Sequence, residues 1–203
     1  MMAPLLMRPI LLLLVALATT AQPITWIQLR RTSCYGVCPD DELTIRTDGT
    51  ATYRGMKSER AGDWRGTLPR ADAQQLVRTI ESLGFAKLDA KYGEWNIDAP
   101  DYFVTVTRGG KSKTVVSHVQ QVPQIAPIIT AILKASANVK WSPEPAALKG
   151  TLPPDMPYTV TCGSRTYHAL SDHDGRYRLP LRNPRACGRV KPLTTSRTHS
   201  SPR

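Results

Sequence analysis

The sequence predicts an α+β fold: a mostly antiparallel sheet in the order β-β-β-α-β-β-α, with two helices packed on one face. Two stretches alternate apolar and polar residues on either side of a turn, at Asp48-Gly49 and at Gly109-Gly110, a pattern typical of β-hairpins. Two others, at 69–84 and 123–136, carry apolar residues at three- and four-residue steps, which predicts amphipathic helices. Hairpins alternating with covering helices indicate a layered α+β domain.

The first half of this domain begins with a strand at 24–32, where ITWIQLRRT is rich in strand-forming residues. The hairpin around Asp48-Gly49 follows it. The first helix starts near Pro69 and ends at Gly84, because proline suits a first helical turn and glycine suits the left-handed position after the last one. Its apolar face is predicted to hold Ala73, Leu76, Val77, Ile80 and Leu83.

The second half repeats the hairpin and the helix. Runs of β-branched and aromatic residues flank Gly109-Gly110 and predict two strands. The helix at 123–136 tolerates Pro127 in its opening turn, and Trp141 closes the domain. The apolar residues of this helix are Ile125, Ile128, Ile129, Ile132 and Leu133.

The composition changes after the α+β domain, which is assigned to 22–142. A proline-punctuated linker is expected at 143–157 and a small β-rich segment at 158–190. The basic tail at 191–203 has almost nothing to bury, so it is predicted to be disordered.

Residues 1–21 have the pattern of a secretory signal peptide. Arg8 precedes a short apolar run at 10–18, and small residues at 19–21 suit cleavage. The run is too short to cross a bilayer comfortably, although an uncleaved N-terminal anchor is the alternative. Nothing downstream approaches the length of a membrane span. We therefore expect a periplasmic or secreted protein with no transmembrane segment after the signal is removed.

The chain has 27 basic and 16 acidic residues, a formal charge of +11. Residues 22–142 hold 16 basic and 12 acidic side chains, whereas residues 143–203 hold 10 and 4, so the excess is concentrated towards the C-terminus. An exported basic protein meets anionic lipid or polysaccharide more often than nucleic acid. The expected partner is an anionic envelope surface or an unidentified protein, and no nucleic acid. A solvated tail without a partner is the alternative, and no particular oligomeric state is indicated.

Cys34 and Cys38 lie four positions apart, with Pro39 directly after them. Residues four apart in an extended strand are about 13 Å apart, so a disulfide requires a turn, which Gly36 makes possible. In an oxidising compartment the disulfide is the expected outcome, and closing so small a loop contributes about 2 kcal/mol. The alternatives are free thiols, or a redox or copper site of the kind found in Sco-type copper chaperones, with His118 as a further ligand.

Cys162 and Cys187 form the second pair, and a bridge between them contributes about 3.5 kcal/mol by the same estimate. Crossed pairing among the four cysteines stays open at the level of sequence. The stretch around SDHDG has the composition of a turn between short strands, with weak metal binding as the alternative. The residues concerned are His168, Asp172, His173 and Asp174.

Trp64 and Trp95 are placed in polar loops, where their flat rings are candidates for contact with a ligand or partner, and Asp98 is a third candidate. The alternative is that these tryptophans cap the edge of the core and that Asp98 braces its loop. No nucleophile, base or carboxylate pair with a credible catalytic role stands out. Phosphate-binding glycine loops and zinc-type cysteine pairs are absent from the sequence, so no metal or cofactor is expected and the sequence leans away from an enzyme.

The cysteine motif and its surroundings resemble the bacterial domain of unknown function 6438 family. The resemblance covers roughly 24–141, and one departure is Asp40-Asp41-Glu42, where a hydrophobic residue and a tyrosine usually follow the proline. It implies an exported or lipoprotein-borne α+β module and supplies no activity. The residues that carry it are Cys34-Tyr35-Gly36-Val37-Cys38-Pro39, LTIRTDGTATYRG, Gly84-Phe85, Asp98 and Trp141.

From these observations we expect a non-enzymatic envelope protein that binds a partner or an anionic surface. A thiol-redox or copper-handling protein that uses Cys34 and Cys38 is the first alternative. An inhibitor of an envelope hydrolase is the second.

Overall fold

The structure is a computed structural model that describes residues 22–36, 38–95, 98–118 and 122–193. The predicted signal peptide at 1–21 and most of the predicted tail, 194–203, lie outside the described residues.

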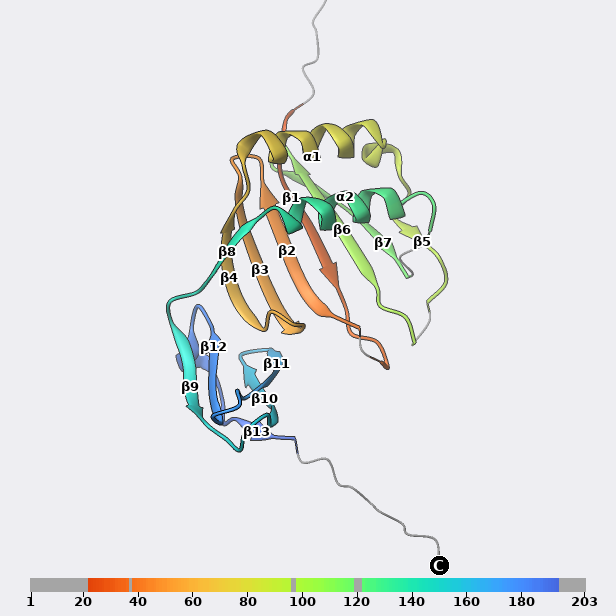
Figure 1. Cartoon of the computed structure of the whole chain (residues 1–203). Helices are drawn as coiled ribbons and strands as arrows, with labels where there is room; N and C mark the ends of the chain where they lie inside the picture. Colours follow the sequence, from red (N-terminus) through yellow and green to blue (C-terminus); the bar gives the residue numbers. More distant parts are fainter. Residues whose placement is uncertain (1–21, 37, 96–97, 119–121, 194–203) are drawn as a thin grey trace, which may run out of the picture.

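The larger part of the molecule, which we call the core domain, is a sheet with two helices on one face (Figure 1). Its helices are α1 (Arg70–Ser82) and α2 (Ala126–Ala137), and a 3-10 turn, η1 (Phe85–Lys87), follows α1. The α+β class predicted from sequence is confirmed. The strands of this part are β1 (Ile24–Arg31), β2 (Asp40–Arg46), β3 (Thr50–Lys57), β4 (Gly62–Thr67), β5 (Lys91–Tyr92), β6 (Tyr102–Arg108), β7 (Lys111–Ser117) and β8 (Lys140–Pro143).

The remaining described residues, 144–193, form a small β-rich unit beside the ends of β3 and β4, which we call the C-terminal module (Figure 1). The Cys162–Cys187 disulfide crosses it. Its elements are β9 (Ala147–Thr151), β10 (Pro157–Cys162), β11 (Arg165–Leu170), β12 (Arg176–Pro180), η2 (Pro184–Ala186) and β13 (Lys191–Pro192).

One sheet continues from the core domain into the module. The strand order is β13-β10-β11-β3-β2-β1-β6-β7-β5, with β4 beside β3 and β8 beside β4, while β12 and β9 form a separate pair. Most neighbours are antiparallel. The pairs β11–β3 and β5–β7 are parallel, so the sheet is mixed. Only His168 and Lys57 are paired between β11 and β3, so the module is attached at one corner of the larger sheet.

The main hydrophobic core lies between the helices and the sheet. Ile80 on α1 is fully buried, as are three isoleucines on α2, Ile128, Ile129 and Ile132. Gly84 has a φ of 69° and ends the first helix as predicted, which lets Phe85 fold back into the core. Leu83, which was predicted on the apolar face, is instead 37% exposed at the end of α1.

Five strands were missed from sequence: β4, β5, β8, β9 and β13. β13 lies at the start of the stretch predicted to be a disordered tail, 191–203, and it is a strand because it pairs with β10. β4 and β8 pair with each other at the edge of the core domain, so Trp64 lies on a strand and not in a polar loop. The stretch predicted to be a linker, 143–157, contains β9, which pairs with β12 along its whole length. These segments are rich in glycine, proline and charge, and their pairing partners specify them more than their own composition does.

Neither helix in the described part of the chain combines the length and the apolar character needed to cross a bilayer.

Candidate binding cleft

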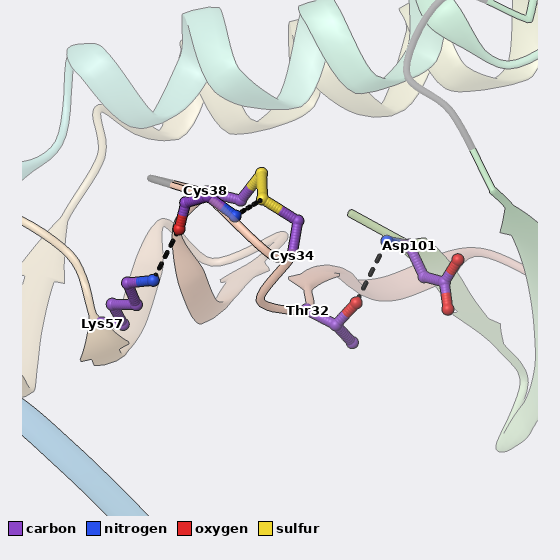
Figure 2. Close-up of a disulfide and its surroundings, with 6 residues drawn as sticks. Thr32, Cys34, Cys38, Lys57 and Asp101 are labelled. Carbon is purple, nitrogen blue, oxygen red and sulfur yellow. Dashed lines mark hydrogen bonds between the residues drawn. A yellow bond between two sulfur atoms is a disulfide. The ribbon is translucent and has the colours of Figure 1, made fainter. Parts of the chain in front are cut away.

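The two cysteines of the β1–β2 connection form a disulfide, as predicted, with their α-carbons 5.4 Å apart. The turn at Gly36 brings them together, and the Gly36 N–H donates a hydrogen bond to Cys34 Sγ. Lys57 Nζ at the end of β3 donates to the Gly36 carbonyl at 2.8 Å (Figure 2). We call this connection, 32–39, the disulfide loop. It holds Tyr35, whose side chain is 89% exposed.

A buried carboxylate anchors the base of the disulfide loop. Asp41 is 1% exposed and lies opposite Arg31 in the β1–β2 register. Two nitrogens of the Arg31 guanidinium, Nε and Nη2, donate to the two carboxylate oxygens, and the Nε bond is 2.8 Å long. The Tyr53 hydroxyl donates to the same carboxylate at 2.8 Å. Burial, together with the charge of Asp41, raises the pKa of Tyr53. The hydroxyl therefore stays protonated and continues to donate to Asp41.

Beside Tyr53, the side chain of Arg60 lies against three aromatic rings. Its guanidinium carbon is 5.6 Å from the ring centre of Tyr53, 5.5 Å from that of Trp64 and 5.4 Å from that of Trp141. Such cation–π contacts hold a guanidinium in place through its flat face. We call Arg60 and these three rings the Arg60 cluster.

In the Arg60 cluster, the indole N–H groups form hydrogen bonds within the described structure, whereas the Arg60 guanidinium does not. Trp64 Nε1 donates to the Ala61 carbonyl at 3.0 Å, and Trp141 Nε1 donates to the Ser136 carbonyl at 3.3 Å. A guanidinium carries five N–H donors. Among the described residues, none accepts a hydrogen bond from Arg60 and none forms an ion pair with it. The cluster therefore presents a positioned cation with unused donors.

Arg60, Tyr53 and Trp64 line an open cleft of about 1150 Å³ between the core domain and the C-terminal module. Four permanent cations line it, and Glu59 is the one carboxylate among its described lining residues. Cys38 and Pro39 of the disulfide loop form part of the rim. The module contributes a largely apolar wall. The four cations are Arg31, Lys57, Arg60 and Arg178, and His168 lines the same space.

Buried ion pairs fix the two walls of the cleft relative to each other. Asp63 on β4 accepts from Arg54 Nε at 2.8 Å and from the backbone N–H of Arg182 in the module at 3.0 Å. Glu144, which is also buried, pairs with Arg65 at 2.8 Å and with Arg182 at 3.4 Å. Each carboxylate bonds one group of the core domain and one group of the module. The module is therefore held by these contacts as well as by the single pairing between β11 and β3.

The candidate contact residues predicted from sequence are distributed over two regions. Trp64 lines the cleft. Trp95, 65% exposed, and Asp98 belong to the connection between β5 and β6 and are not among the residues that line the cleft. Arg60 and Trp141 were not singled out from sequence as site residues. Of the three aromatic residues that surround Arg60, Trp141 is far from the other two in the sequence, so their spacing did not indicate that they meet around one arginine.

The two candidate metal ligand sets are not assembled around a common point. His118 is buried and pairs through Nδ1 with Asp101 at 2.6 Å. In the SDHDG stretch, Asp172 accepts the backbone N–H groups of Asp174 and Arg176, which is the turn that the sequence predicts. The described residues contain no group of three His, Cys, Asp or Glu side chains that could hold a metal ion.

The fold and cleft define a disulfide-braced α+β protein with a basic site at the junction of two parts. The chain belongs to the DUF6438 family, a domain of unknown function, whose sequence model matches residues 25–135. No curated protein and no solved structure matches the chain. The family match includes the disulfide loop, Tyr53, Arg60 and Trp64, and it ends before the C-terminal module begins.

Proposed function

We propose that the protein is an exported, non-enzymatic binding protein that holds an anionic partner in the cleft between the core domain and the C-terminal module. The observation that carries the proposal is Arg60, a cation held by three aromatic rings with its donors unused by the described residues. A guanidinium in that state is suited to carboxylate or phosphate, which accept from two of its N–H groups at once.

The charge of the surrounding cleft supports the same conclusion. Lys57 and Arg178 hydrogen-bond only backbone carbonyls in the described structure, at Gly36 and at Glu144 and Pro145. Their charges are therefore not neutralised by a contacting carboxylate. A cleft lined mainly by positive charge raises the local concentration of a negatively charged partner and speeds its association.

Export is supported by two features. The first 21 residues have the composition of a signal peptide, and the chain contains two disulfides, a bond that persists mainly in oxidising compartments. The proposal places the protein in the periplasm or outside the cell.

A thiol-redox function is the second candidate, because Cys38 lies at the rim of the cleft. Asp40, Asp41 and Glu42 directly follow the motif, whereas a reactive thiolate is favoured by positive surroundings. Mass spectrometry of alkylated protein with and without mild reductant tests this candidate. A bond that opens under mild reductant while the second disulfide stays closed would favour it.

The binding proposal is tested with three anionic probes: polyglutamate, polygalacturonate and phosphatidylglycerol vesicles. Tryptophan fluorescence of the full chain is the readout, since Trp64 and Trp141 contact Arg60. At least one probe is expected to bind, with an affinity that falls as salt rises. Arg60→Gln is expected to weaken that binding by about ten- to a hundredfold, because a charged hydrogen bond contributes about 1.5–3 kcal/mol.

Arg46→Gln is the matched control, because Arg46 is an exposed arginine at the end of β2 that does not line the cleft. It removes the same charge and should change the affinity little. The proposal fails if none of the three probes binds, or if the two arginine variants weaken binding equally.

A further inference from the structure

Two exposed leucines lie at the mouth of the cleft on the side of the C-terminal module. Leu170 is 66% exposed and Leu193 is 42% exposed. Pro157 lies between them, since it is paired with Leu170 across the β10–β11 register and its carbonyl accepts the N–H of Leu193 at 2.8 Å. All three line the cleft. We call them the leucine patch.

The opposite wall of the cleft has a different chemistry. It holds Arg60 with its unused donors and Lys57 at the end of β3. The disulfide loop adjoins this wall and carries Tyr35, the most exposed of the large hydrophobic side chains that the structure describes. A ligand between the walls meets most of the cations on the core-domain side, and on the module side it meets the leucine patch together with Arg178 and His168.

An extended polypeptide matches this two-sided arrangement. Successive side chains of an extended strand point in opposite directions, so alternate residues face opposite walls. Acidic side chains would then face Arg60 while apolar ones face the leucine patch. The cleft is open and has a volume of about 1150 Å³, so it can admit an extended segment of a longer chain.

Other anionic partners match only one wall. An acidic polysaccharide brings carboxylates without apolar side chains to cover the leucines. A membrane surface is broad and flat, so it matches a concave cleft less well than an extended segment does. We propose that the cleft holds an extended protein segment in which acidic and apolar side chains alternate, an inference that rests on the binding function proposed above.

The test uses short fluorescent peptides, capped at both ends, and measures their anisotropy with the full chain. The alternating Glu-Leu peptide is compared with an alternating Glu-Ser peptide and an alternating Lys-Leu peptide. A third comparison is a block peptide that has the same composition as the Glu-Leu peptide but carries its glutamates in one half and its leucines in the other. The alternating Glu-Leu peptide should bind most tightly. The Glu-Ser peptide should bind about tenfold more weakly, because it cannot bury apolar area on the leucine patch.

Two variants assign the effect to the two walls. The double change of Leu170→Ser and Leu193→Ser should remove the advantage of Glu-Leu over Glu-Ser without affecting the Glu-Ser peptide. Leu83→Ser, at an exposed leucine at the end of α1, is the control and should preserve that advantage. Arg60→Gln should weaken both acidic peptides.

The outcomes separate this inference from the binding function. Equal affinity for Glu-Leu and Glu-Ser, or for the alternating and block peptides, would overturn the alternating segment and leave anion binding intact. The same holds if polygalacturonate or the vesicles bind and no peptide does. If no anionic probe binds, both proposals fall.

Discussion

At the scale of single residues, Arg60 differs from the other arginines near it in what surrounds its guanidinium. Arg31 and Arg54 each bond a buried carboxylate, Asp41 and Asp63 respectively, whereas Arg60 contacts three rings and no acid among the described residues. A sequence does not distinguish these environments, because both kinds of partner come from other strands. This is why sequence patterns identified Trp64 but missed the arginine that it contacts.

Asp41 provides a prediction at this scale. The change Asp41→Asn keeps the size of the side chain but removes the charge that balances Arg31. It should lower the free energy of unfolding by about 3 kcal/mol, because it leaves one partner of a buried pair without its counter-charge. Urea denaturation monitored by circular dichroism measures the change.

Glu59→Gln is the control for Asp41→Asn, since Glu59 is exposed and forms no ion pair recorded among the described residues. It should alter stability by no more than about 0.5 kcal/mol. Equal effects of the two changes would show that Asp41 does not anchor the disulfide loop.

At the scale of elements, the sequence predicts the segments whose pattern of apolar residues or turn residues is contained in a short stretch of the chain. The Asp48-Gly49 turn and the two helices follow from alternation and helical spacing, and the Cys34–Cys38 disulfide follows from the close spacing of two cysteines around Gly36. β4 does not follow in this way. A Cβ added at Gly66 would lie 2.3 Å from Val139, so the strand needs glycine for close packing against its neighbour. Glycine is depleted in strands, and it therefore conceals the strand in the sequence.

The two disulfides should differ in what they stabilise. Replacing Cys162 and Cys187 with alanine should cost the C-terminal module about 3.5 kcal/mol, whereas replacing Cys34 and Cys38 should cost about 2 kcal/mol on the same estimate of loop entropy. The second hydrophobic core, which the module shares with Met56 of β3, has few members, so the module has little else to hold it.

Limited proteolysis distinguishes the two disulfide variants. Without Cys162–Cys187, cleavage should occur within 144–193 while the core domain stays resistant. Without Cys34–Cys38, new cleavage should appear at the disulfide loop and the module should stay intact. Early cleavage of the core domain in the first variant would contradict this independence.

At the scale of the whole molecule, the cleft exists because two parts are fixed against each other. Met56 extends from β3 into the core of the module, and Asp63 and Glu144 bond groups on both sides of the junction. The family match ends at residue 135. Arg60 therefore lies inside the matched region and the leucine patch lies outside it.

The site as a whole was less predictable than the fold. Sequence patterns indicated a basic C-terminal region and an anionic partner, but they placed a linker where β9 forms. A cleft between two parts depends on long-range pairing, such as the contact of His168 with Lys57. The periodic spacing of apolar residues within a short stretch of sequence does not predict such a contact.

The most direct test of the cleft as the binding site is hydrogen–deuterium exchange of the full chain, with and without the alternating Glu-Leu peptide at saturation. The account predicts slower exchange at the tip of the β3–β4 hairpin, 57–61, and around Leu170 in the module. Exchange in the connection that holds Trp95 and Asp98 should be unchanged. Slowing confined to that connection, with none at 57–61, would contradict the account.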